Sequence, residues 1–213
     1  MDDKSLKINA ICLSAKVSVI LYVSTYLVGF ILYLSNIHSG SFFVKISNLI
    51  PMGIVLLFTL MTGQSLYPER RLDPHDILKL ASVYLACFVL FLLLPVFSLV
   101  FPAEDVEIIR GENNLESFIY ILSIIVFFPF FEEYIFRGII YRHLRNSFGF
   151  ILSLIISCSL FSYFHALGFD NFEHFFILGT FFCLSYELTG SYLGSFFVHS
   201  AYNLSWVIFV FLA

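Results

Sequence analysis

The sequence has few charged residues for its length. Only 12% of its 213 residues are Asp, Glu, Lys or Arg, and the formal net charge is -4. The basic residues form only short groups beside apolar runs. A protein that binds nucleic acid needs a basic patch, so this class of partner is excluded.

Cysteine is also scarce, and several catalytic signatures are absent. The four cysteines lie in four different apolar runs, so neither a disulfide framework nor a CxxC metal site is indicated. The sequence contains no Gly-x-Ser-x-Gly and no HExxH. The usual serine-hydrolase and zinc-peptidase classes are therefore not indicated, and no cofactor or metal site is predicted.

Apolar residues, in contrast, are abundant. Hydrophobic residues make up 60% of the chain and aromatic residues 19%, and the mean hydropathy is +0.93. Runs of about 18 to 25 apolar residues match the thickness of a bilayer core. We therefore predict an all-α, polytopic transmembrane bundle of about seven spans. The predicted spans are 12–34, 46–66, 77–101, 117–141, 150–166, 172–189 and 192–212.

The distribution of basic residues predicts the orientation of this bundle. Lys and Arg concentrate in cytoplasmic loops. One side of the predicted bundle carries Lys4, Lys7, Lys16, Arg70, Arg71, Lys79, Arg142 and Arg145. The other side has only Lys45 and Arg110. We therefore expect a cytoplasmic N-terminus and an external C-terminus, with the acidic segment 102–116 as a solvated external connector.

Three polar intrusions interrupt the apolar runs of the C-terminal half. The first is Glu132, Glu133 and Arg137, at the end of an apolar run that starts at Phe118. An ionisable group at such a position costs at least about 2.5 kcal/mol. Phe161–His165 and His199–Asn203 place further proton-handling groups in apolar segments. Three such segments predict one buried polar site.

Helix geometry separates the two glutamates. Glu133 and Arg137 are four residues apart and share a helix face, whereas Glu132 and Arg137 point about 140° away from each other. Arg137 is therefore expected to neutralise Glu133, which leaves Glu132 as a candidate general base. Pro129 has no N–H to give to the carbonyl of Ile125, so the helix should loosen there.

The other polar residues can reach the same depth. A turn at 146–149 places Glu133 about 20 Å along one helix and His165 about 22 Å along the next. His199 and Asn203 share a helix face about 12 to 18 Å into the membrane. A carboxylate and a histidine can deprotonate water, and a second histidine with an asparagine can stabilise an oxyanion. Such a set can hydrolyse an amide.

At these residues the sequence resembles the CAAX-protease and bacteriocin-processing (CPBP, Abi) family of intramembrane glutamic endopeptidases, which includes the Ras-converting prenyl protease. The motifs EExxxR, FxxxH and HxxxN of that family are present in order. They are read as Glu132-Glu133-x-x-x-Arg137, Phe161-x-x-x-His165 and His199-x-x-x-Asn203. The resemblance covers residues 116–213, the expected catalytic core of a single membrane domain. Residues 1–110 match only as N-terminal helices.

The resemblance implies a role for each motif residue. Glu132 would activate water with help from His165, while His199 and Asn203 would stabilise the oxyanion. Glu133 and Arg137 would form a supporting pair, and Phe161 would shape the wall of the substrate pocket. The expected substrate is a hydrophobic or lipid-anchored peptide or protein in the bilayer of a bacterial cell, and no oligomeric state is predicted.

Two alternatives to the metal-free protease remain open. The first is a zinc-dependent membrane protease with Glu132, His165 and His199 as ligands, because two histidines and a carboxylate form a known catalytic set. The second is a non-catalytic immunity or scaffold protein of the same family that keeps the pocket to bind a peptide.

Overall fold

The computed structural model describes residues 3–35, 42–65, 68, 70–93, 103–111, 113–166 and 171–212, and the regular structure of these residues is entirely helical. The helices are α1 (Asp3–Leu34), α2 (Phe42–Ser47), α3 (Leu49–Met61), α4 (Pro74–Leu93), α5 (Ala103–Arg110), α6 (Asn114–Leu122), α7 (Phe128–Glu133), α8 (Arg142–Phe148), α9 (Phe150–Ala166), α10 (Phe172–Thr189) and α11 (Tyr192–Leu212). Two π-helical segments, η2 (Ser123–Phe127) and η3 (Tyr134–Tyr141), join α6 to α7 and α7 to α8. The predicted all-α class is confirmed.

The helices agree with the predicted spans. Four of them are long and apolar enough to cross a bilayer: Lys7–Leu34, Pro74–Phe91, Asn114–Phe148 and Tyr192–Leu212. The apolar helices Lys45–Met61 and Phe150–His165 are shorter. Together with α10, they account for the seven predicted segments. The predicted end of the third span at 101 lies outside the described residues.

Large apolar side chains on the outer surface show which solvent these helices face. Val23 of α1 is 60% exposed and Leu78 of α4 is 76% exposed. Exposed apolar side chains follow the full length of α1. Contiguous apolar surface of this extent is rare on water-soluble monomers and is typical of a surface covered by lipid.

The ends of three helices have clear local causes. The Asp73 side chain accepts hydrogen bonds from the N–H groups of His75 and Asp76, at 2.9 and 3.2 Å, and so caps α4. Gly149 ends α8 with a φ of 78°, and Gly190 ends α10 with a φ of 63°. These left-handed conformations carry little cost for glycine, so the chain turns sharply at both points.

Segment 102–116 differs from the predicted solvated connector, because it contains α5. The Ile109 side chain is only 2% exposed and packs in a small apolar cluster with Tyr120 of α6 and Val210 of α11. Val106 and Ile109 are three residues apart and give α5 one apolar face. The acidic residues around them make the segment polar on average, so its composition alone does not reveal this face. α5 is therefore part of the bundle.

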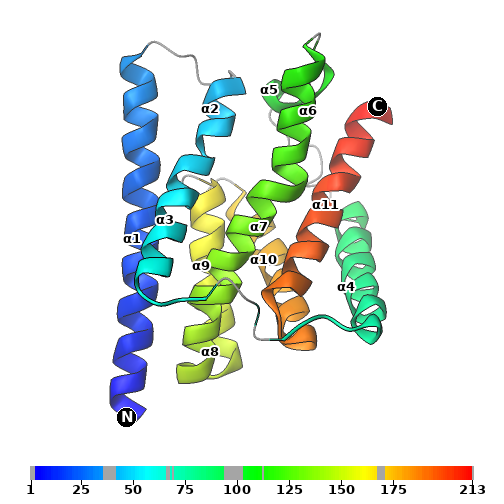
Figure 1. The fold of residues 1–213 in the computed structure, drawn as a ribbon. Helices are drawn as coiled ribbons and strands as arrows, with labels where there is room; N and C mark the ends of the chain where they lie inside the picture. Colours follow the sequence, from blue (N-terminus) through cyan, green and yellow to red (C-terminus); the bar gives the residue numbers. More distant parts are fainter. Residues whose placement is uncertain are drawn as a thin grey trace.

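The helices are arranged around α7 and η3. Figure 1 shows the N-terminus and α8 at one end of the bundle, and α5, the start of α6 and the C-terminus at the other. α1 packs on α3 and α8, whereas α4 packs on α10 and α11 at the opposite side. Every residue of η3 is buried. The helix with the Glu-Glu-x-x-x-Arg motif thus lies in the interior. The division of the chain into N-terminal helices (1–110) and a catalytic core (116–213) stays a prediction.

Candidate active site

One continuous helical stretch from α6 to α8 carries the Glu-Glu-x-x-x-Arg motif. Its hydrogen bonding changes from α to π in η2 and again in η3, and α7 lies between these two segments. A π-helix bonds each N–H to the carbonyl five residues earlier, and such segments are frequent at functional sites. Glu132 and Glu133 are the last two residues of α7, next to η3.

The π register of η2 creates an acceptor for Asn203. The N–H of Phe128 donates to the carbonyl of Ser123. The next donor in this register would be residue 129, which is a proline and has no N–H. Instead, Nδ2 of Asn203 donates to the Ile124 carbonyl at 2.7 Å. The loosened helix expected near Pro129 is thus present as the π segment η2, and Asn203 bonds the carbonyl of Ile124, the residue before Ile125.

This arrangement predicts a coupling between Asn203 and Pro129. The Asn203→Leu substitution should lower the free energy of unfolding by about 1–3 kcal/mol, since it leaves the Ile124 carbonyl without a donor. In a Pro129→Ala background the same substitution should cost less, because the new N–H of residue 129 can donate to Ile124. Thermal unfolding of the four proteins in detergent measures both costs. Equal costs in the two backgrounds would contradict the assignment.

Glu133 and Arg137 form a fully buried ion pair. Nη1 of Arg137 lies 3.1 Å from Oε1 of Glu133, and both side chains are 0% exposed. The second terminal nitrogen of Arg137 donates to the Gly179 carbonyl at 2.9 Å. The guanidinium also lies over the Phe161 ring, 4.5 Å from its centroid. The predicted pair therefore forms, and Phe161 packs directly against it.

Glu132 faces the two motif histidines. Its Oε2 lies 3.3 Å from Nε2 of His165 on α9 and 3.8 Å from Nε2 of His199 on α11. The side chain of Glu132 is 8% exposed and that of His165 20%. Helices α7, α9 and α11 thus bring the three side chains together, although 67 residues of sequence separate Glu132 from His199.

Both histidines are held in the same way by their other ring nitrogen. Nδ1 of His165 lies 2.9 Å from the Phe161 carbonyl, and Nδ1 of His199 lies 2.9 Å from Oε1 of Glu133. A carbonyl and a carboxylate can only accept, so each Nδ1 carries a proton and donates it. In the neutral ring Nε2 is then unprotonated, and it is the nitrogen that faces Glu132.

A cavity of about 180 Å³ joins the motif residues. Glu132, His165, His199 and Asn203 all line it, and Phe161 contributes to its wall. A polar cavity of this size can hold more than one water molecule. The structure therefore brings Glu132, His165, His199 and Asn203 to one internal space. Glu133 and Arg137 do not line the cavity, and both side chains are fully buried.

Comparison with protein families adds an independent observation. Residues 114–205 match the family described as type II CAAX prenyl endopeptidase Rce1-like. This segment is an Rce1-like domain. Its range includes all three motifs, from Glu132 to Asn203, so the family predicted from the motifs is confirmed. At the level of the family, residues 114–205 are thus similar to CAAX-type membrane proteases.

The other comparisons give no match. Neither the curated proteins nor the solved structures include a chain that this sequence matches. Within the described residues, no group of three or more His, Cys, Asp or Glu is arranged to hold a metal ion.

The cavity at Glu132 also includes residues that the motifs do not identify. Besides Phe161, its further lining residues are Asp105, Tyr120, Ile124, Phe128, Phe175, Leu178, Tyr202 and Trp206. Tyr202 could have been found, since it precedes Asn203 within the third motif. Asp105 lies outside residues 114–205 and could not have been, because its position depends on how α5 packs.

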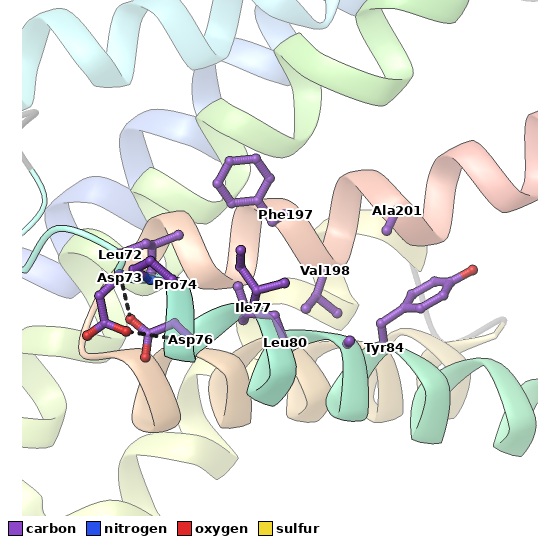
Figure 2. A pocket seen from close by; sticks show the side chains of 11 residues that line it. Leu72, Asp73, Pro74, Asp76, Ile77, Leu80, Tyr84, Phe197, Val198 and Ala201 are labelled. Carbon is purple, nitrogen blue, oxygen red and sulfur yellow. Dashed lines mark hydrogen bonds between the residues drawn. The ribbon is translucent and has the colours of Figure 1, made fainter.

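A larger groove lies outside this cavity. Its volume is about 600 Å³, and it runs between α4 and α11, as Figure 2 shows. Ile77, Leu80 and Val198 form apolar walls, and Asp73 and Asp76 lie at one end. None of its lining residues lines the cavity at Glu132, because α11 separates the two spaces. The groove is thus not part of the Glu132 site.

Proposed function

We propose that the protein is an intramembrane endopeptidase of the glutamic type, which hydrolyses a peptide bond of a membrane-associated peptide or protein. The observation that supports this function is the contact of Oε2 of Glu132 with Nε2 of both His165 and His199 in a cavity shared with Asn203. The match of residues 114–205 to the family of CAAX-type endopeptidases agrees with it.

The charges of the buried cluster favour one additional proton. Glu132 and Glu133 carry two negative charges, and Arg137 carries one positive charge. A charge buried without a partner is costly, so the cluster is most stable when a further proton makes it neutral. Nε2 of either histidine and Oε2 of Glu132 can hold it. In the proposed mechanism, Nε2 of His199 holds it.

In the proposed first step, Glu132 and His165 activate a water molecule. The water in the cavity donates a hydrogen bond to Glu132, which takes the proton as the oxygen attacks the carbonyl carbon of the substrate. Nε2 of His165, unprotonated in the neutral ring, lies 3.3 Å from the same carboxylate oxygen and accepts a second hydrogen bond from the water. The tetrahedral intermediate then collapses, its C–N bond breaks, and the nitrogen leaves as an amine with the proton that Glu132 took from the water.

His199 and Asn203 stabilise the oxyanion in this proposal. Nδ1 of His199 is already committed to Glu133, so its Nε2 donates to the oxyanion in the protonated ring. The carboxylate of Glu133 compensates the resulting charge. Nδ2 of Asn203 has two hydrogens, of which the Ile124 carbonyl takes one. The second remains for the oxyanion, and the first fixes the amide in place.

The composition and the family determine the proposed substrate and location. A hydrophobic or lipid-anchored peptide can reach a cavity inside a helical bundle from the bilayer. The protein is an integral membrane protein, which several long apolar helices support. A cytoplasmic N-terminus follows from the positive-inside rule.

Comparative peptidomics of membranes tests the function. Cells with the wild-type protein should accumulate cleaved peptides that cells with Glu132→Gln lack, at equal levels of the two proteins. Identical peptidomes would overturn the proposal and favour a non-catalytic protein. The activity of the purified protein on an identified substrate should persist after treatment with a metal chelator. Loss of activity that added zinc restores would favour the zinc-dependent alternative.

A further inference from the structure

The catalytic cavity extends beyond the motif residues toward one end of the bundle. Asp105 of α5 and Tyr120 of α6 line the same cavity as Glu132. Figure 1 shows α5 and the start of α6 at the end of the bundle that also carries the C-terminus. Tyr120 precedes Glu132 by 12 residues, about 18 Å of helix. The cavity therefore has a catalytic end at Glu132 and an acidic end at Asp105.

The carboxylate of Asp105 is held by two contacts to one oxygen, and its other oxygen can accept a further hydrogen bond. Its Oδ1 lies 2.9 Å from Nζ of Lys45 and accepts a hydrogen bond from the Tyr120 hydroxyl at 2.8 Å. Among the described residues, its Oδ2 has no partner. The Asp105 side chain is only 13% exposed. A carboxylate accepts through both oxygens, so one side of Asp105 is free to bind a donor in the cavity.

The surroundings of Asp105 determine which donor fits. Apart from Asp105, the walls near this end are mainly aromatic or aliphatic, including Tyr120, Ile124 and Trp206. Such walls suit the aliphatic stem of a lysine or arginine, whose charged head then meets the carboxylate. Aromatic faces also attract cations. A carboxylate on the substrate would find no donor in Asp105.

We propose that Asp105 determines substrate specificity by binding a cationic residue of the peptide, a lysine or an arginine, while the scissile bond lies at Glu132. This inference rests on the proposed function. The Asp105 and Glu132 ends lie roughly 10 to 20 Å apart, given the rise of the helix and the length of the tyrosine side chain. An extended peptide advances about 3.3 Å per residue, so the basic residue lies about three to six residues from the cleaved bond.

A lysine scan of a synthetic peptide tests this inference. The probes are hydrophobic peptides of alanine and leucine that carry one lysine at each position in turn, together with a lysine-free parent. Mass spectrometry locates the cleaved bonds in detergent micelles. The wild-type protein should cleave at a fixed distance from the lysine and prefer the best peptide over the parent by about tenfold or more, as expected for a hydrogen bond to a charged group.

Two variants separate specificity from structure. Asp105→Asn should remove the preference for lysine, so that the lysine peptides and the lysine-free parent are cleaved at similar rates. Lys45→Met removes the same ion pair but leaves the carboxylate, so the preference for lysine should increase. If Asp105 only ties α5 to α2, both variants should behave alike. That result, or a wild-type cleavage pattern independent of the lysine, would overturn the inference.

The proposed function can fail separately. If the wild-type protein cleaves none of the peptides, the test moves to binding of the same peptides to Glu132→Gln, measured with a fluorescent label. Binding that depends on the lysine and on Asp105 would support the inference without the protease. Binding that depends on neither would overturn it.

Discussion

The Glu132→Gln variant is expected to fold like the wild-type protein and to lose at least about 10²- to 10⁴-fold in kcat, the range for removal of a general base. Glutamine has the size of glutamate, and its amide can donate a hydrogen bond to Nε2 of a neutral His165. It cannot take a proton from water. The loss should therefore appear in kcat on a peptide found by peptidomics, while thermal unfolding in detergent stays close to that of the wild-type protein.

Glu187→Gln provides the matched control. Glu187 is also a carboxylate at the edge of the bundle interior, where it accepts from Tyr141 at 2.8 Å and pairs with Arg145 at 2.9 Å. It does not line the catalytic cavity. The same chemical change there should leave kcat within about a factor of five, the effect expected of an exposed ion pair. Comparable activity in the two variants would remove Glu132 from the mechanism.

The parts of the site that depend on local geometry could be predicted from the sequence. The Glu133–Arg137 pair follows from a separation of four residues, since the contact needs only one helix. The common depth of Glu132 and His165 follows from a short turn between two helices of known rise. Gly149 makes that turn short, and both side chains do meet. In these cases the distances along the chain determine the contacts.

The remaining features depend on contacts between distant segments. The π register of η2 is accompanied by the bond from Asn203, 79 residues away, to the Ile124 carbonyl. Glu133 accepts a hydrogen bond from His199 as well as from Arg137. The spacing of residues along one helix cannot predict a donor that comes from another helix. Almost uniform hydrophobicity also hides which face of each helix is buried. Periodicity therefore could not place Asp105 or Tyr120 at the cavity.

The second large effect is expected at the buried pair. Arg137→Met should lower the free energy of unfolding by about 3–5 kcal/mol, because it leaves the charge of Glu133 buried without its main partner. Glu133→Gln should cost a similar amount, since Arg137 then lacks a counter-ion. In the double variant Glu133→Gln/Arg137→Met no uncompensated charge remains in the pair. Its cost should be well below the sum of the two single costs.

Thermal and denaturant unfolding of the four proteins measures this coupling, and Arg145 with Glu187 gives the control cycle. The control pair is 38% and 26% exposed, so its coupling should be no more than about 1 kcal/mol. Additive costs at Glu133 and Arg137 would contradict the role of the pair. Activity provides a second measure. The double variant keeps an acceptor for Nδ1 of His199 but loses the carboxylate that stabilises its protonated ring, so its stability should recover further than its kcat.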